Sequence, residues 1–233
     1  MANLYLIPVT LGESDTDMVI PSRNMDIIRP LSHLIVENIR TARRFLKKAD
    51  RNLDTDQITF YELNKHTDQQ TVHRFLDPVR LGFDTGLMSE AGCPGVADPG
   101  AEVVRIAHEH GIHVVPLVGP SSILLAMMAS GMNGQNFAFN GYLPIPKAEK
   151  YKRIRQLERR IYNENQSQLF IEAPYRNMNL LDDLLSVCQP GTRLCVACDI
   201  TLPTEEIRTL PVCEWKKNKP ELHKRPTIFI LGK

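Results

Sequence analysis

The sequence predicts a two-domain α/β protein, and two observations carry that prediction. Over residues 1–118, short apolar runs of strand length alternate with stretches of helix length, as in βα units around a parallel sheet. Near the C-terminus, strand-like runs at 193–198, 206–211 and 227–231 follow one another without helices between them, which indicates antiparallel or mixed pairing. We therefore expect an N-terminal α/β domain over residues 1–118 and a C-terminal α/β domain over residues 119–233.

The first domain is expected to contain strands at residues 4–9, 33–36, 57–61, 85–89 and 112–117. Between the second and third of these, apolar residues recur at steps of three and four from Ile39 to Ala49, which predicts an amphipathic helix. After the fourth strand, Asp98 is expected to be the N-cap of a helix, with Pro99 at the first helical position.

The second domain is expected to begin with a buried helix at 123–131 that ends at Gly131, because this run is almost entirely apolar. A strand at 137–143, a long amphipathic helix at 147–160, a strand at 168–172 and a helix at 174–187 follow, before the three closing strands.

The composition is that of an ordinary soluble enzyme. With 233 residues, 42% of them hydrophobic, the chain can form a real core, and no apolar run approaches the ~20 residues of a membrane span. The N-terminus has no basic region before its apolar run, so we expect a cytoplasmic protein. The five scattered cysteines argue against a disulfide framework. Cys195 and Cys198 form a CxxC without a second pair, so we interpret them as core residues and expect no metal.

The segment from Gly86 to Gly100 is the most informative part of the chain. It contains four glycines and two prolines between an apolar run and a helix start. A backbone with few side chains at the carboxyl end of a strand lets a small molecule approach main-chain groups closely, so the segment is typical of a binding loop. A tight βα connection is the alternative. A second loop of the same kind, Leu117-Val118-Gly119-Pro120-Ser121-Ser122, follows the next apolar run.

Together with Phe137-Ala138-Phe139-Asn140-Gly141-Tyr142-Leu143-Pro144 and Phe170-Ile171-Glu172-Ala173-Pro174-Tyr175-Arg176, these loops resemble the tetrapyrrole methylase superfamily. The likeness is greatest to its branch of small-subunit ribosomal-RNA 2′-O-ribose methyltransferases. The resemblance implies a two-domain tetrapyrrole methylase-like fold that binds S-adenosylmethionine in the cleft between the domains, and a homodimer. The cofactor residues that it implies are Met88, Ser89, Glu90, Ala91, Gly92, Val96, Ser121, Ser122, Phe139, Asn140, Gly141, Ala173, Pro174 and Ile200.

The chain departs from this branch on the substrate side. The branch usually has a strand and a Thr-Pro-Ile-Gly-Asn loop where this chain has Pro8-Val9-Thr10-Leu11-Gly12-Glu13-Ser14. Its Glu-Asp-Thr-Arg segment appears as Glu37-Asn38-Ile39-Arg40, and its Ser-Asp-Ala-Gly-Thr-Pro-Gly as Ser89-Glu90-Ala91-Gly92-Cys93-Pro94-Gly95. Two aspartates are therefore replaced, by Asn38 and Glu90.

Basic residues gather on the two amphipathic helices, at 39–51 and 147–160, although the net charge is only +1. Such a face is often merely solvated, but two of them on a nucleotide-modifying enzyme favour RNA as the partner. The segment Tyr61-Glu62-Leu63-Asn64 also resembles a substrate-side stretch of the branch, with a solvated turn as the alternative. The expected substrate-binding residues are Arg40, Arg43, Arg44, Asn64, Lys150 and Arg153.

Methyl transfer needs an acceptor held about 3 Å from the methyl carbon in a dry site, which main-chain groups can achieve. A ribose hydroxyl must also lose its proton, so a positioned base would help. Glu37, Glu62 and Glu90 are the candidate carboxylates, and Glu37 and Glu62 are our choice for the base. The alternative for each is a capping or ion-pairing role.

The sequence therefore predicts an S-adenosylmethionine-dependent methyltransferase that acts on a 2′-hydroxyl of ribosomal RNA. Three other functions remain open. A methylase of tetrapyrroles or other small molecules would use the same cofactor loops, but would need an apolar trough in place of basic helices. A non-catalytic RNA- or protein-binding descendant would fit the two changed aspartates. A regulator could use the loops for another adenosine compound.

Overall fold

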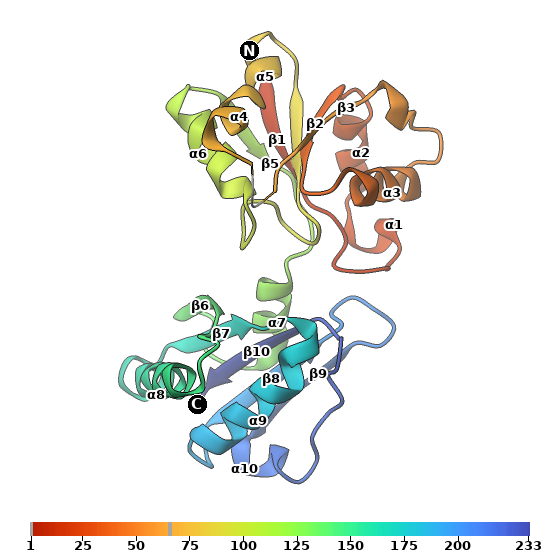
Figure 1. Cartoon of the computed structure of the whole chain (residues 1–233). Coiled ribbons are helices and arrows are strands. Elements are labelled where there is room, and N and C mark those ends of the chain that lie inside the picture. The colour runs from red at the N-terminus through yellow and green to blue at the C-terminus, as the bar shows by residue number, and fades with distance from the viewer. Residues whose placement is uncertain (1, 65–66) are drawn as a thin grey trace. The chain divides into compact units, whose positions relative to one another are not determined.

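The computed structural model describes residues 2–64 and 67–233, and divides the chain into two compact units. Unit 1 ends at Ser121, and unit 2 comprises Ser122–Lys233 (Figure 1). Each unit is built around its own five-stranded sheet.

Unit 1 contains a parallel sheet with the strand order β3-β2-β4-β1-β5. Its strands are β1 (Asn3–Ile7), β2 (His33–Val36), β3 (Thr59–Glu62), β4 (Thr85–Met88) and β5 (His113–Pro116). Helices connect them: α1 (Thr16–Val19), α2 (Ser22–Ile28), α3 (Ile39–Ala49), a 3₁₀ turn at Thr55–Gln57, α4 (Gln69–Arg74), α5 (Asp77–Arg80) and α6 (Gly100–Glu109).

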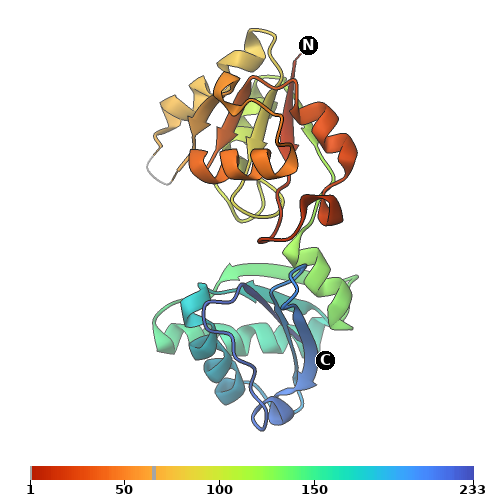
Figure 2. The ribbon, with the colours of Figure 1, turned by 90° about the vertical axis from the view of Figure 1, so that its right-hand side faces the viewer.

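The helices of unit 1 cover both faces of its sheet. One apolar core joins residues of α2 and α3, such as Ile28 and Leu46, to Ile7 and Met88 of the sheet. The other joins residues of α4, α5 and α6 to Leu4, Ile35 and Leu87. Figure 2 shows α3 in front of the strands. This is the doubly wound α/β arrangement, in which central strands are apolar on both faces.

Unit 2 contains a mixed sheet with the order β6-β7-β10-β8-β9, as the closing strands of the sequence predicted. Its strands are β6 (Phe137–Tyr142), β7 (Ser167–Ile171), β8 (Arg193–Cys198), β9 (Glu206–Pro211) and β10 (Thr227–Gly232). β6 and β7 are parallel, and the other neighbours are antiparallel. The helices are α7 (Ser122–Ser130), α8 (Lys147–Glu164), α9 (Asn177–Val187) after a 3₁₀ turn at Pro174–Arg176, and α10 (Val212–Trp215).

The main core of unit 2 lies between its sheet and the helices α8 and α9. Phe229 and Leu231 of β10 belong to this core, together with Trp215 of α10, whose Nε1 donates to Leu194 O at 2.8 Å. Alternate residues of a strand point to opposite faces. The buried Ile228 and Ile230 therefore lie on the other face, where α7 packs against β8, β9 and β10.

Three expectations about the elements are wrong. Helix α7 is not buried, because it packs on the sheet with one side and leaves Met128 78% exposed. Asp98 is not a helix N-cap: Pro99 occupies that position and α6 starts at Gly100, since the Asp98 carboxylate forms a turn by accepting from Gly100 N at 2.7 Å. The closing strands are also interrupted by the short helix α10, between β9 and β10.

Two of the cysteines lie in the core, as the sequence predicted. Cys195 and Cys198 are completely buried in β8 and are unpaired, like the other three. Within residues 2–64 and 67–233, no three or more His, Cys, Asp or Glu side chains cluster in a way that could hold a metal ion. Nor does any helix in those ranges have the length and apolar character needed to cross a bilayer.

Candidate active site

The candidate site in unit 1 lies where the parallel strands end. In open α/β sheets, ligands bind outside the carboxyl ends of the strands, where neighbouring strands lead to helices on opposite faces. β1 and β4 are such neighbours, because β1 leads to α2 in one helical layer and β4 leads to α6 in the other. The described segments at this edge include residues 8–15, 37–38, 63–64, 89–99 and 117–121, among which are the first glycine-rich loop and most of the second.

Gly92 joins three of these segments. Its N–H donates to Val9 O at 3.2 Å and its carbonyl accepts from Val9 N at 2.9 Å. Its φ is +73°, and an added Cβ would lie 3.2 Å from Leu11 Cδ2 and 3.4 Å from Pro120 O. A glycine is therefore needed here for the backbone itself. A larger residue at this position would disturb unit 1 as well as any ligand.

Glu37 lies beside the predicted cofactor segment. It follows β2, and its Oε1 accepts from Glu90 N, just after β4, at 3.1 Å. Glu90 Oε1 accepts in turn from Thr41 Oγ1 at 2.5 Å. Burial is the main reason that the pKa of Glu37 lies above its ordinary value. The hydrogen bond from Glu90 N lowers this pKa, whereas the negative charges of Asp98 and Glu90 raise it. A carboxylate with a raised pKa at a loop edge is the type of group that serves as a general base.

The second candidate base, Glu62, is arranged differently. It ends β3, which is one strand further from β4 than β2 is, and its side chain is exposed. Asn64 follows in an exposed turn, in which its N–H donates to Thr67 Oγ1 at 2.9 Å. The side chain of Glu37 is thus linked to the Met88–Gly92 segment by a hydrogen bond, whereas that of Glu62 is exposed at the end of β3.

Asp98 is a member of this site that the sequence analysis did not identify as one. Its Oδ1 accepts from Gly95 N at 2.9 Å as well as from Gly100 N, which fixes the end of the glycine-rich loop. Burial raises the pKa of Asp98, against those two hydrogen bonds, which lower it. The spacing Gly95-x-x-Asp98-x-Gly100 was the available signal, since a carboxylate between glycines commonly accepts from their N–H groups.

Most basic residues of α3 are paired within unit 1. Arg43 forms an ion pair with Asp56 and lies over the ring of Phe60, 5.0 Å from its centroid. Arg44 Nη2 lies 3.5 Å from Glu13 Oε1. Arg40 is exposed beside the Asn38 cap, where Asn38 Oδ1 accepts from its N–H at 2.9 Å.

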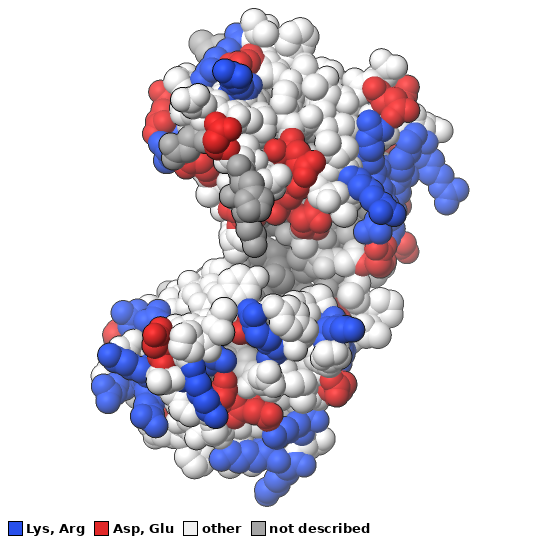
Figure 3. All heavy atoms as spheres, viewed as in Figure 1, with Lys and Arg blue, Asp and Glu red and all other residues white. Residues whose placement is uncertain are grey.

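Lys150 and Arg153 of α8 do not lie on the free basic face, which corrects the expectation for both. Lys150 is only 9% exposed, and its Nζ lies 3.0 Å from Asp183 Oδ2 of α9. Arg153 is half-buried, and its Nη2 donates to Asn140 Oδ1 at 3.0 Å. The exposed cations of α8 are Lys147, Lys152, Arg155, Arg159 and Arg160, in the region where Figure 3 shows Lys and Arg gathered over this helix.

The predicted cofactor segments of unit 2 adjoin one another. β6 and β7 are parallel neighbours, and their register shifts between Phe139 and Tyr142. Asn140 lies in this irregular stretch, where its Nδ2 donates to Leu169 O at 3.2 Å, and Gly141 has a φ of +62°. Arg153 thus orients Asn140 where the register of β6 and β7 shifts.

The turn after β7 is held by a buried ion pair that the sequence analysis missed. Glu172 Oε1 accepts from Ala173 N at 2.7 Å and from Nε and Nη2 of Arg176 at 2.9 and 2.6 Å. The side chain of Glu172 is 2% exposed and that of Arg176 is 31% exposed. This pair fixes the Ala173–Pro174 turn from inside. The four-residue spacing of opposite charges around Pro174 was the signal available in the sequence.

The remaining predicted cofactor residues lie in different settings. Ser121 ends unit 1 and Ser122 begins α7. Val96 is exposed in the glycine-rich loop, whereas Ile200 is buried after β8, between two residues with positive φ.

The segments fit the methyl donor that the resemblance implies. Ala91 is exposed and Ala173 is half-buried, while a Cβ at Gly141 would meet nothing within 4 Å. In each unit taken by itself, main chain and small side chains are accessible at these segments, which would let an adenosine-containing ligand approach them closely.

No protein-family model matches the chain, but known proteins do. Over its whole length the chain is similar to the methyltransferase CobJ, with a TM-score of 0.67, 16% identity and 95% of that chain covered. It is also similar to uroporphyrin-III C-methyltransferase from Thermus thermophilus complexed with S-adenosylhomocysteine, with a TM-score of 0.58, 19% identity and 98% of that chain covered. The fold is that of the tetrapyrrole methylases, a class of methyltransferases, as the sequence predicted.

The sequence relatives are more specific. The chain is 30% identical over 212 residues to the ribosomal RNA small subunit methyltransferase I of Vibrio cholerae serotype O1. The matched region covers 91% of this chain and 69% of the relative. The chain belongs to the ribosomal RNA small subunit methyltransferase I family, which confirms the branch that its loops indicated.

Proposed function

We propose that this chain, an S-adenosylmethionine-dependent methyltransferase, methylates a ribose 2′-hydroxyl of small-subunit ribosomal RNA. The observation that carries this proposal is the placement of Glu37. Its carboxylate accepts the N–H of Glu90 within the predicted cofactor segment, and burial raises its pKa. A base held against the cofactor loop is what a hydroxyl acceptor needs, because the hydroxyl must lose a proton.

In the proposed reaction, S-adenosylmethionine supplies an electrophilic methyl group, which becomes bonded to the ribose oxygen as S-adenosylhomocysteine is released. Glu37 accepts the proton that leaves the hydroxyl. Glu90 orients Glu37 through its N–H, and Thr41 holds the side chain of Glu90. The cofactor residues of the proposal are those that the resemblance implied, with Glu172 and Arg176 as positioning residues for the turn at Ala173.

The proposed RNA contacts differ from the first expectation. Lys150 and Arg153 are left out because each has a partner inside unit 2. Arg40 of α3 and Asn64 after β3 remain, together with the exposed cations of α8, Lys147, Lys152, Arg155, Arg159 and Arg160. These cations are exposed, and exposed cations can release the counterions of RNA when they contact phosphates.

We also propose a domain boundary close to residue 118, a homodimer and a cytoplasmic location. The compact units, which meet at Ser121, support the boundary. Exposed apolar residues of unit 2, such as Met128, Tyr142 and Ile145, support a protein interface. The unpaired cysteines support a reducing compartment.

The test is transfer of labelled methyl groups to small-subunit RNA from a strain that lacks this protein. We expect the parent to label a ribose, and Glu37→Gln to lose about 10²–10⁴ in rate with unchanged affinity for S-adenosylhomocysteine. Glu62→Gln is the matched control and should lose less. Equal rates for the parent and Glu37→Gln would contradict the base assignment. Tight binding of the cofactor product without transfer to any RNA would contradict the RNA acceptor.

A further inference from the structure

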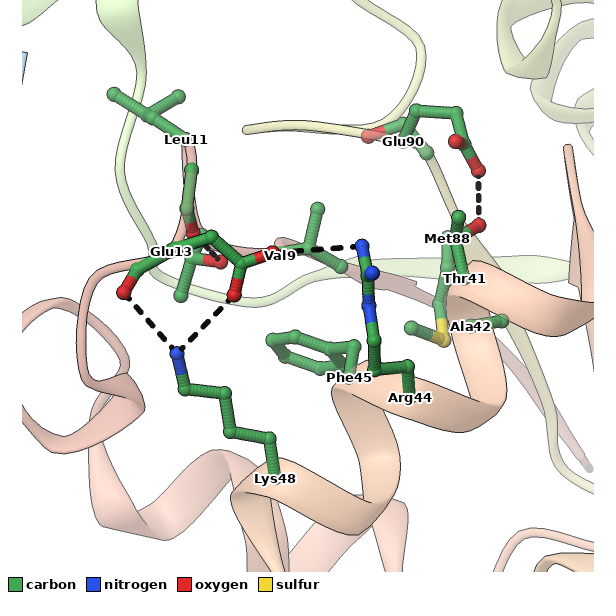
Figure 4. Close-up of a pocket in the computed structure, with 13 residues that line it drawn as sticks. Val9, Leu11, Glu13, Thr41, Ala42, Arg44, Phe45, Lys48, Met88 and Glu90 are labelled. Carbon is green, nitrogen blue, oxygen red and sulfur yellow. Dashed lines mark hydrogen bonds and ion pairs between the residues drawn. The ribbon is translucent and has the colours of Figure 1, made fainter. Parts of the chain in front are cut away.

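A cavity of about 150 Å³ opens beside the carboxyl ends of β1 and β4. Its lining comes from three parts of unit 1: the loop after β1, one side of α3 from Thr41 to Lys48, and the end of β4 with the two residues that follow it. Figure 4 shows its apolar floor, which includes Val9, Ala42 and Met88, and its charged rim. On one side of the rim stands Glu90, whose carboxylate accepts from Thr41 Oγ1.

The other side of the rim carries two cations and one carboxylate. Lys48 Nζ donates to the carbonyls of Glu13 and Ser14 at 3.2 and 3.0 Å and lies 3.8 Å from Glu13 Oε2. Arg44 instead meets Glu13 through the carboxylate, at 3.5 Å. In Figure 4 the carboxylate of Glu13 stands between these two cations. Lys48 therefore holds the backbone of the loop and also pairs with the carboxylate of Glu13, whereas Arg44 contacts only that carboxylate.

The contact between Arg44 and Glu13 is easily exchanged. Their side chains are 71% and 78% exposed, and exposed pairs contribute about 0.2–1 kcal/mol. A backbone phosphate offers a guanidinium two oxygens for a bidentate contact, as a carboxylate does, and carries the same single negative charge. An anion that reaches the rim can therefore take the place of Glu13 at little cost.

We propose that Glu13 occupies the position of a backbone phosphate of the substrate RNA and is displaced from Arg44 when that RNA binds. This inference rests on the proposed function, because it takes RNA as the acceptor. The cavity then receives the nucleotide next to that phosphate, with the apolar floor beneath it. Glu13 lowers the affinity for any RNA whose other contacts are too few to displace it. The pair of Glu13 and Arg44 therefore selects for RNA that makes further contacts with the protein.

The proposal predicts that removing a charge strengthens binding. In Glu13→Gln, Arg44 no longer has to exchange a carboxylate for the phosphate, so RNA affinity should rise about two- to fivefold, the worth of an exposed pair. The affinity should also fall more steeply with salt, by up to about 0.7 in the logarithmic slope for single strands, because the charge brought to the phosphate is no longer offset.

Asp15→Asn is the matched control. Asp15 is exposed on the same loop, and the replacement changes the net charge of the protein by the same amount. Arg44→Gln completes a double-mutant cycle: the gain from Glu13→Gln should be smaller when Arg44 is absent, with Lys48 accounting for the remainder. Affinities are measured by fluorescence anisotropy with a labelled single-stranded oligoribonucleotide, and inorganic phosphate is titrated in a second arm. Thermal melting checks that each variant is folded.

A gain in Glu13→Gln that Asp15→Asn lacks, and that depends on Arg44, supports the proposal. Equal affinities for Glu13→Gln and Asp15→Asn overturn it. A Glu13-dependent effect on inorganic phosphate without one on RNA also overturns it, because the site would then serve a free anion. Methyl transfer to RNA by the parent protein tests the proposed function separately. If the parent transfers methyl groups but Glu13→Gln does not change RNA affinity, only this inference is contradicted. If Glu13→Gln raises RNA affinity but the parent transfers no methyl group, the proposed function is contradicted.

Discussion

Replacing Arg176 by methionine tests the turn that we assign to the cofactor. The guanidinium of Arg176 neutralises the carboxylate of Glu172, whose side chain is 2% exposed. Without it, Glu172 Oε1 keeps the bond from Ala173 N at 2.7 Å and loses those from Nε and Nη2. A buried carboxylate that loses its partner costs about 3–5 kcal/mol of folding free energy.

The expected loss for Arg176→Met is about 3 kcal/mol, at the low end of that range, because the Arg176 side chain is 31% exposed and water can reach its place. Glu172→Gln should cost less, about 1–2 kcal/mol, because the amide oxygen still accepts from Ala173 and Arg176 but without charge. Affinity for S-adenosylhomocysteine should fall in both variants, since the turn loses its inner support.

Trp215, the single tryptophan, makes the measurement specific to unit 2, where it is fully buried. Urea unfolding followed by its fluorescence gives the free energy of that unit. Lys219→Met is the matched control: Lys219 pairs with Asp182 at 2.6 Å, but the two side chains are 43% and 55% exposed, so the loss should stay below about 1 kcal/mol. Equal losses in Arg176→Met and Lys219→Met would refute the argument from burial.

Three further predictions follow from unit 1 and from the thiols. Gly86→Ala should destabilise unit 1 by about 1–3 kcal/mol, seen as faster hydrogen exchange in β4, because its Cβ would lie 2.4 Å from Leu34 Cδ2. Unchanged exchange would contradict this. Because the pKa of Glu37 is raised in the folded protein, its ionisation opposes folding, and the free energy of unfolding should fall as pH rises from the ordinary pKa of 4.5 through the raised pKa. In Glu37→Gln this part of the curve of stability against pH should be flatter. A curve of unchanged slope in Glu37→Gln would contradict the prediction. The methyl-transfer rate should rise over the same window. Ellman's reagent should modify the exposed Cys213 in the native protein but should react with Cys188 only in denaturant, because Cys188 is buried and burial raises the pKa of its thiol. Rapid reaction of Cys188 in the native protein would contradict its burial.

Many of the strands could be predicted well from the sequence, because they are short apolar or alternating runs between polar turns. The predicted bounds at 33–36, 193–198 and 206–211 agree with β2, β8 and β9. The order of the strands could not be predicted from the residues alone, since pairing depends on contacts distant in the chain. Helix α7 was mistaken for a buried helix because an apolar helix on a sheet face reads the same as one surrounded by protein.

The candidate site was predicted less evenly. Its glycine-rich segments were visible because glycine and proline act locally, but side-chain partners were not. Lys150 illustrates this: it was counted as a surface cation, although it stands four residues before Ile154 and therefore on the apolar stripe of α8. Its ammonium is partly buried because Asp183 of the neighbouring helix α9 accepts from it. The spacing along one helix cannot supply that partner.

The two changed aspartates are compatible with a working site. Asn38 caps α3, since its Oδ1 accepts from Arg40 N at 2.9 Å and Thr41 N at 3.2 Å, and asparagine caps as well as aspartate does. Glu90 has the longer side chain that reaches Thr41. A carboxylate at position 38 would add a negative charge next to Glu37, whose pKa the charges of Asp98 and Glu90 already raise. The neutral cap therefore keeps Glu37 closer to the pKa of a base that is ionised near neutral pH.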